Sequence, residues 1–236
     1  MTILYVGDLH GDLNAMKDID QRATNDGVAA IVQVGDFGFL WKTKGRLTDF
    51  DEYLYSRQSN IPLYTCGGNH ENYDNWDRKR KAEGYNPLTP GYTTLAHGTT
   101  SKGKVYWVHR GSCLVIDGKK HLFLGGAQST DKHLRVEGKT WWKQEMPTYQ
   151  DLLMFSEALE VEKPDFVVTH DGPQDVVREM GFDWDSNLSR DLQGILDNSN
   201  HSPAKWYFGH YHTWQMNYFG NSGFYCCGAH GDGWHG

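Results

Sequence analysis

The chain has 236 residues and carries 23 Lys and Arg against 30 Asp and Glu, a net charge of −7. Apolar residues make up 38% and aromatic residues 14%, which is typical of a folded protein and excludes a disordered one. The length favours a single domain over residues 1–236, because single α/β domains often reach about 250 residues. The acidic balance disfavours stable binding to duplex DNA, which requires a strong basic field.

The sequence carries no signal for a membrane or for secretion. No stretch reaches about 18 uninterrupted apolar residues, so no transmembrane helix is predicted. The apolar run at residues 1–6 is too short for a signal peptide and lacks a basic region before it. The cysteines form no CxxC pair, so a disulfide framework is not expected and a reducing cytoplasm fits best. They are Cys66, Cys113, Cys226 and Cys227.

Short apolar runs alternate with amphipathic stretches in the first third of the chain. Helical spacing of apolar residues predicts helices, and short apolar runs predict buried strands. The alternation indicates parallel strands joined by right-handed crossovers. The predicted strands cover residues 3–6, 30–34 and 61–66, and the predicted helices cover residues 13–23 (ended by Gly27), 47–55 and 72–83.

The pattern changes after residue 100. Three short strands at 105–108, 113–116 and 121–124 are expected to be antiparallel, with Asp117-Gly118 as a hairpin turn. The Gly-rich tail, residues 228–236, is expected to be mobile. The remaining predicted elements are helices at 149–161 and 188–196 and strands at 166–168, 206–208, 215–219 and 224–226.

Five apolar runs each end in Asp, Asn or His. Ligands of α/β sheets gather beyond the carboxyl ends of the strands. In extended chain, residues i and i+2 point the same way, so Asp8 with His10, and His210 with His212, can each present two ligand atoms to one place. The polar groups at the strand ends are Asp8, His10, Asp36, Asn69, His70, His170, His210 and His212.

Each of these motifs alone has an ordinary explanation. Asp8 could cap a following helix, and two histidines in an HxH pattern could lie on the surface. Burying the complete set without a cation would be costly, which favours a metal site. The two Asp, the Asn and four of the five His are too many for one ion and suit two ions that share a carboxylate. Mixed imidazole and carboxylate ligands favour Mn, Fe, Zn, Co or Ni over calcium.

Five motifs in order resemble the calcineurin-like metallophosphoesterase superfamily, in particular its small bacterial and phage-type members. They are GDLHG at residues 7–11, GD at 35–36, GNHE at 68–71, the single His170 and GHYH at 209–212. The resemblance implies a four-layer α/β/β/α sandwich with mixed parallel and antiparallel sheets. It also implies two divalent transition-metal ions, with Mn favoured and Fe, Zn, Ni or Co as alternatives.

The resemblance also assigns roles by position. Asp36 would bridge the two ions, and an activated hydroxide would attack phosphorus. His70 would bind the phosphate together with Asn69 and protonate the leaving oxygen, with a structural role as the alternative. Glu71 would orient the ligands. The first ion would be held by Asp8, His10, Asp36 and His212, and the second by Asp36, Asn69, His170 and His210.

The chain departs from the protein phosphatases of this superfamily after Asp36. Their extended GDxVDRG motif is replaced by an aromatic run at residues 37–41, which either forms a wall of the substrate site or packs in the core. In the segment 131–142, Arg135 could clamp a phosphate oxygen and Lys132 could add a charge. Trp141 or Trp142 could stack on a base, or the segment could be a solvated loop with packed tryptophans.

These features favour an enzyme that hydrolyses phosphodiesters, with a small nucleotide-like or cyclic-nucleotide-like substrate. A phosphomonoesterase with a more cationic pocket is the first alternative. A metal-bearing scaffold without catalysis is the second, although such relatives lose the histidine that this chain keeps as His70. A nuclease subunit of the recombination type would need an added DNA-binding region, which is not evident. The sequence predicts neither the natural substrate nor the oligomeric state.

Overall fold

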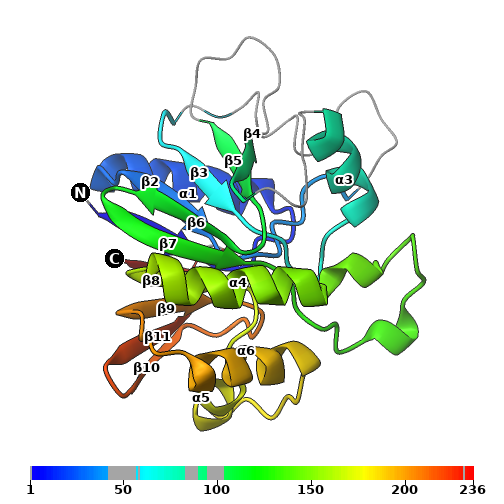
Figure 1. Cartoon of the computed structure of the whole chain (residues 1–236). Helices are drawn as coiled ribbons and strands as arrows, with labels where there is room; N and C mark the ends of the chain where they lie inside the picture. The colour runs from blue at the N-terminus through cyan, green and yellow to red at the C-terminus, as the bar shows by residue number, and fades with distance from the viewer. Residues whose placement is uncertain (1, 42–56, 58, 83–89, 95–103, 231) are drawn as a thin grey trace.

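Two six-stranded sheets pack face to face in the computed structural model of the chain, and helices cover the outer face of each sheet (Figure 1). The structure describes residues 2–41, 57, 59–82, 90–94, 104–230 and 232–236. The predicted α/β fold with two mixed sheets is therefore confirmed.

The first sheet has the strand order β12-β1-β2-β3-β5-β4. Its four inner strands run parallel, and β4 and β12 lie antiparallel at the edges. Among the described residues, the helices α1 (Leu13–Asp26) and α3 (Tyr73–Ala82) accompany it. The strands are β1 (Ile3–Val6), β2 (Ala30–Gln33), β3 (Leu63–Thr65), β4 (Tyr92–Thr94), β5 (Val105–Val108) and β12 (Gly233–His235).

Local sequence explains both ends of α1. The Asp12 carboxylate accepts hydrogen bonds from the backbone N–H groups of Asn14 and Ala15, which would otherwise lack partners at a helix start. Gly27 ends the helix with φ of 63°, a conformation that glycine adopts without strain. The helix buries Met16 and Ile19 against the sheet, so its axis and the loop before it are fixed.

The second sheet has the order β10-β11-β9-β8-β7-β6, with β7, β8, β9 and β11 parallel and the two edges antiparallel. Its outer face is covered by α4 (Tyr149–Glu162), α5 (Gln174–Glu179) and α6 (Asn187–Asn198) (Figure 1). The strands are β6 (Ser112–Ile116), β7 (Lys119–Leu124), β8 (Phe166–Thr169), β9 (Lys205–Phe208), β10 (Gln215–Phe219) and β11 (Ser222–Cys226).

An apolar layer between the sheets holds the sandwich together. It is formed by buried residues of both sheets, including Val32, Phe123 and Val168. The rings of Tyr5 and Tyr207 stack in parallel across this layer, with centroids 3.6 Å apart. Each fully buried side chain of this size contributes about 1.5–3 kcal/mol. The two sheets therefore form a rigid base for the loops at their strand ends.

Three expectations differ from the structure or fall outside it. The middle of the chain is antiparallel only in part, because β5 pairs in parallel with β3 and β7 pairs in parallel with β8. The Gly-rich tail, expected to be mobile, forms β12, where Leu4 and Val6 of β1 pair with His235 and Gly233. The helix predicted at 47–55 lies outside the described residues.

Candidate metal centre

The polar residues predicted from the strand ends come from both sheets. Asp8, Asp36 and Asn69 follow β1, β2 and β3 of the first sheet, and His170 and His210 follow β8 and β9 of the second. Contacts between His10 and His212 and between Asn69 and His170 join the two sets. The predicted residues therefore meet where the carboxyl ends of the two sheets lie together.

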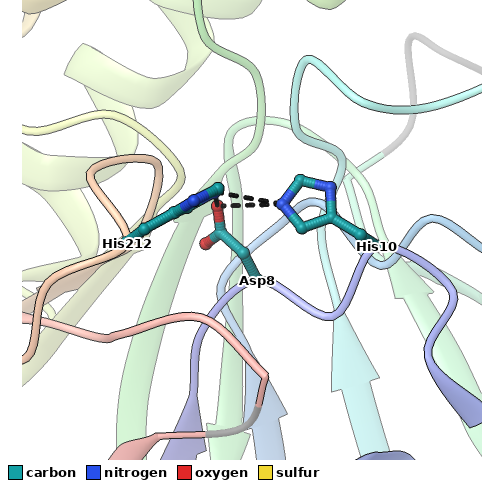
Figure 2. A group of neighbouring side chains, drawn as sticks. All are labelled: Asp8, His10 and His212. Atoms are coloured by element: carbon teal, nitrogen blue, oxygen red, sulfur yellow. Dashed lines mark hydrogen bonds and ion pairs between the residues drawn. The ribbon is translucent and has the colours of Figure 1, made fainter.

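One group of ligand atoms contains Asp8, His10 and His212 (Figure 2). The Nε2 atoms of His10 and His212 lie 3.0 Å apart. The Asp8 Oδ2 atom lies 3.0 Å from Nε2 of His212 and 3.9 Å from Nε2 of His10. Two imidazoles and one carboxylate thus direct their donor atoms at a common point, as ligands of a transition metal do.

Asp36 lies between this group and a second one. Its Oδ2 atom is 3.9 Å from Nε2 of His10, and its Oδ1 atom is 3.3 Å from Nε2 of His170. Asp8, Asp36 and His170 form a separate group of possible metal ligands, and so do His10, Asp36 and His70. The position of Asp36 fits a carboxylate shared by two ions.

Asn69 and His210 lie on the His170 side. The Oδ1 atom of Asn69 is 3.2 Å from Nε2 of His170. The His210 ring lies edge-on to that of His170, with centroids 5.3 Å apart. The His210 backbone N–H also donates to Oδ1 of Asp8 at 3.1 Å, so the loop after β9 is tied to the end of β1.

Two buried carboxylate oxygens test whether these residues fit a metal. Asp8 and Asp36 are 0% and 1% exposed. Among the described residues, the Oδ2 atom of Asp36 lacks a hydrogen-bond partner, and that of Asp8 faces the His212 imidazole at 3.0 Å. A buried carboxylate oxygen without a partner is costly unless a cation compensates it. Since imidazole nitrogens converge on the same two oxygens, the donor set fits divalent transition-metal ions.

The backbone at the site is held in an unusual conformation. His10, Asp36, His210 and His212 have φ values of 49°, 53°, 70° and 52°. Non-glycine residues rarely adopt positive φ, at a cost of about 1–3 kcal/mol each, and such residues gather at functional sites. The surrounding structure therefore stabilises a constellation that the local chain does not favour.

Glycines allow these loops to approach one another. A Cβ atom on Gly68 would overlap the Asp36 carboxylate, and one on Gly35 would overlap the His170 ring. Gly35 also has φ of 108°, which favours glycine at that position. The glycine before each motif thus provides the close packing of ligand side chains.

The buried pair of Asp36 and His170 dominates the electrostatics of the site. Burial disfavours both charged forms, but each group stabilises the charge of the other. The Asp36 carboxylate, together with that of Asp8, holds the pKa of His170 above its ordinary value. Conversely, His170 holds the pKa of Asp36 well below its usual range. The site therefore stabilises positive charge in the interior.

The pKa values of His70 and His10 are lowered, whereas that of His170 is raised. Burial lowers the pKa of His70 to about 4, and the Arg135 guanidinium lowers it further against the opposing effect of Asp36. Burial also lowers the pKa of His10, against the opposing effect of Asp36 and Asp8. Both rings are therefore neutral at pH 7, and a neutral imidazole has a nitrogen lone pair available.

Comparison with known proteins decides the family. The sequence profile of the calcineurin-like phosphoesterases matches residues 1–214. The chain belongs to the calcineurin-like phosphoesterase family. This family of phosphoric ester hydrolases depends on binuclear metal centres. No curated protein sequence matches the chain.

Solved structures agree with this fold. The crystal structure of TT1561 of Thermus thermophilus has a TM-score of 0.61 and 16% identity, covering 97% of this chain and 89% of that one. GAP50, the anchor in the inner membrane complex of Plasmodium, has a TM-score of 0.53 and 17% identity, covering 97% and 71%. Among the described residues of this calcineurin-like phosphoesterase, no helix combines the length and apolar character that a membrane span requires.

Glu71 fixes the loop that carries Asp36. Its buried carboxylate accepts hydrogen bonds from the Phe37 backbone N–H at 2.8 Å and from Nε1 of Trp76 at 2.7 Å. Burial and the nearby Asp36 carboxylate raise the pKa of Glu71 to about 8. Phe37 and Phe39 are both fully buried, so this part of the aromatic run packs in the core and forms no substrate wall.

The segment 131–142 brings Arg135 to the site. Arg135 Nη2 lies 2.8 Å from Nε2 of His70, and Arg135 Nε lies 2.7 Å from Oδ1 of Asp131. Trp142 is 3% exposed and packs in the core of the first sheet. The Lys132 ammonium lies 4.2 Å from the centre of the Trp141 ring. Trp142 therefore offers no face to a base, and one face of Trp141 is covered by Lys132.

Two sets of residues outside the five motifs hold side chains and loops of the site in place. Asp171 accepts hydrogen bonds from the Tyr211 hydroxyl at 2.7 Å and the Ser186 hydroxyl at 2.7 Å. It thereby ties the loop between His210 and His212 to the start of α6. The second set consists of Ser129 and Glu145, which connect to Asn69. Adjacency to His170 and the position of Tyr211 inside GHYH were the only sequence signals for the first set.

Proposed function

We propose that this chain is a metal-dependent phosphodiesterase that acts on small nucleotide-like or cyclic-nucleotide-like substrates. The observation that carries the hydrolase proposal is the pair of buried carboxylates, Asp8 and Asp36, on which imidazole nitrogens converge. The Oδ2 atom of Asp36 also lacks a hydrogen-bond partner among the described residues. Family membership supports the same chemistry.

We assign two cation sites to these residues. Divalent ions bound there, with Mn favoured and Fe, Zn, Ni or Co as alternatives, would supply Lewis-acid activation of water and of the phosphoryl group. Asp36 would belong to both sites, since its two oxygens face the two groups. The first site would comprise Asp8, His10, Asp36 and His212, and the second Asp36, Asn69, His170 and His210.

His70 and Arg135 would bind the phosphoryl oxygens beside Asn69. A guanidinium can only donate hydrogen bonds, so Nε2 of His70 accepts from Arg135 and the ring proton lies on Nδ1 in this arrangement. An anionic substrate oxygen would accept from Arg135 in place of the imidazole. The released Nε2 atom carries only a lone pair in this tautomer, so the Nδ1–H group of His70 would be the donor to the leaving oxygen as charge develops there.

The charge around Arg135 favours a diester over a monoester. The Asp131 carboxylate, 2.7 Å from Nε of Arg135, compensates much of the guanidinium charge. A phosphodiester carries one negative charge, whereas a monoester approaches two at neutral pH. The compensated guanidinium therefore suits the monoanion. The phosphomonoesterase remains the second candidate, because Arg135 and His70 could also hold a dianion.

The test is hydrolysis of bis- and mono-(p-nitrophenyl) phosphate by the protein loaded with Mn²⁺, with an EDTA-treated sample as the control. We expect a higher kcat/KM for the diester and no turnover after chelation. A higher kcat/KM for the monoester would overturn the diester proposal. Full metal loading without turnover of either ester would instead favour the non-catalytic scaffold.

A further inference from the structure

A chain of three buried side chains leads from the candidate metal centre into the interior. Nδ2 of Asn69 donates to the Ser129 hydroxyl at 3.3 Å, and that hydroxyl donates to Oε2 of Glu145 at 2.6 Å. Asn69, Ser129 and Glu145 are 4%, 3% and 1% exposed. Solvent is therefore largely excluded as a replacement partner for any of these groups.

The donor-to-acceptor direction of these hydrogen bonds is set at Glu145. The backbone N–H of Ser129 donates to Oε1 of Glu145 at 3.1 Å, so both carboxylate oxygens accept. Since the Ser129 hydroxyl has one proton and commits it to Glu145, only its lone pairs remain for Asn69. A hydroxyl that can only accept requires the NH₂ side of the Asn69 amide.

The direction of the chain determines which Asn69 atom faces the site. With its NH₂ group turned to Ser129, the amide presents Oδ1 toward Nε2 of His170 at 3.2 Å. His170 is also the neighbour of Oδ1 of Asp36, at 3.3 Å. The opposite amide orientation would direct two N–H bonds at this point, and a cation repels such donors.

Glu145 is itself held in place. Arg110 donates from Nη2 to the carbonyl oxygens of Gln144 and Glu145, at 2.8 and 3.1 Å. It also donates from Nη1 to the carbonyl oxygen of Met146 at 3.2 Å. The backbone around Glu145 is thus anchored to the connection between β5 and β6, on the same rigid base as the site.

We propose that Ser129 and Glu145 are positioning residues that select the cation-binding orientation of the Asn69 amide. They do so by hydrogen-bond direction, without contact to substrate or ion. The inference rests on the proposed second cation site, in which Asn69 Oδ1 is a ligand. It explains why a buried carboxylate and a buried hydroxyl, both outside any motif, lie next to this residue.

Glu145→Gln gives the sharpest test, because it reverses the direction of the hydrogen bonds while the side chain keeps its shape. The Ser129 N–H still requires an oxygen at the Oε1 position, so the new NH₂ group faces the Ser129 hydroxyl. The hydroxyl then accepts from residue 145 and donates to Asn69, whose amide turns its NH₂ group toward the cation site. We expect about 10–100-fold weaker binding of the second Mn²⁺, measured by calorimetric titration.

Ser129→Ala and Ser129→Thr form a matched pair. Ser129→Ala removes the acceptor and should weaken binding of the same ion, whereas Ser129→Thr keeps the hydroxyl and should restore it. Ser156→Ala on α4 and the exposed Glu179→Gln on α5 serve as controls that keep wild-type affinity. Unchanged affinity of the second Mn²⁺ in both Glu145→Gln and Ser129→Ala would overturn the inference.

A measurement on the metal-free protein tests the hydrogen bonds from Asn69 through Ser129 to Glu145 without any ion or substrate. The side-chain NH₂ protons of Asn69 should exchange slowly with solvent in the wild type and in Ser129→Thr, and faster in Ser129→Ala and Glu145→Gln. Equal exchange in all four would contradict the inference. Absence of hydrolysis by a wild-type protein that binds two Mn²⁺ ions would count against the proposed function alone, because neither readout depends on turnover.

Discussion

Two buried histidines show how the interior of the sandwich differs from its polar end. His121 on β7 and His170 after β8 are both 0% exposed. His121 lies between the sheets, where its Nε2 meets the Tyr5 hydroxyl at 2.6 Å and its Nδ1 meets the Lys119 carbonyl oxygen at 2.9 Å. These partners are neutral, and burial lowers the pKa of His121 to about 4.

His170 is buried as deeply, yet its pKa moves the opposite way. Burial alone would lower it, but the carboxylates of Asp36 and Asp8 raise it above the ordinary value. Burial therefore gives a neutral histidine unless uncompensated negative charge lies beside it. This excess of buried negative charge distinguishes the polar end as a place for cations.

The largest expected effect follows from removing Asp36, the carboxylate proposed to be shared by the two ions. Asp36→Ala deletes the group that faces both His10 and His170. Since residues that only support a ligand account for about 10–100-fold in metal affinity or activity, loss of a ligand shared by two ions should cost more than about 100-fold. Metal content by mass spectrometry and the rate of diester hydrolysis measure this. The exposed Asp183→Ala should behave as the wild type; two ions retained by Asp36→Ala would contradict the shared role.

Replacing His70 should separate catalysis from metal binding. His70→Ala removes the imidazole beside Arg135, and we expect kcat to fall by about 100-fold or more, as for removal of a general acid or base. The metal content should stay at the wild-type value. Esters with poor leaving groups should suffer more than those of p-nitrophenolate, and the exposed His133→Ala should not affect kcat. Wild-type turnover by His70→Ala would remove this residue from the mechanism.

His121 makes the stability of the interior depend on pH. Its pKa is about 4 in the folded state, against about 6.5 in the unfolded state, so below pH 6.5 the unfolded chain binds a proton that the folded chain does not. Stability is therefore full above pH 6.5 and falls as the pH decreases toward 4, by about 2 kcal/mol at pH 5.

The variant His121→Gln should remove this contribution, because glutamine does not titrate and can still bond to Tyr5. Urea unfolding of metal-free protein between pH 8 and pH 5 measures the difference. The half-buried His201→Gln serves as the control and should keep the wild-type pH dependence. A pH dependence unchanged in His121→Gln would contradict the assignment.

A smaller effect should appear when metal binds. Because the pKa of His170 is raised above 6.5, this residue carries a proton at pH 6 in the metal-free protein, and ligation requires its removal. The hydrogen bond to Asp8 also raises the pKa of His212, another proposed ligand, so filling both sites with Mn²⁺ should release up to about two protons at this pH. Calorimetry in buffers of different ionisation enthalpy detects the release. An observed enthalpy that does not vary with the buffer would contradict it.

The sequence predicts those parts of the site that follow directly from strands. Asp8, Asp36 and His170 each lie within three residues of the end of a short buried strand, and the sheet topology determines where such residues lie. The prediction from the β-strand period was wrong for the HxH pair, because His10, His210 and His212 have positive φ and are not extended. His212 joins Asp8 and His10, while His210 lies beside His170. The two mixed sheets could be predicted because central strands such as β1, β2 and β8 are short, fully buried runs.

The supporting residues could not be predicted because their partners are distant in sequence. Ser129 and Glu145 acquire their role only when the segment between β7 and α4 folds against Asn69, which lies 60 residues before Ser129. The aromatic run at residues 37–41 allowed two predictions, because the sequence does not distinguish a Phe37 that is buried in the core from one that faces a substrate. The Gly-rich tail lacks the apolar pattern of a strand, and its pairing depends on an edge that only the folded sheet provides.

The pairing of this tail has a consequence for solubility. Strand β1 is buried throughout, and its outer edge is covered by β12, with further backbone bonds from Ile3 to Gly236. Without residues 232–236, the backbone groups on that side of an entirely apolar strand would be exposed, and such edges template pairing with other molecules. The last few residues thus protect the protein from self-association, while the same strand carries Asp8 at its end.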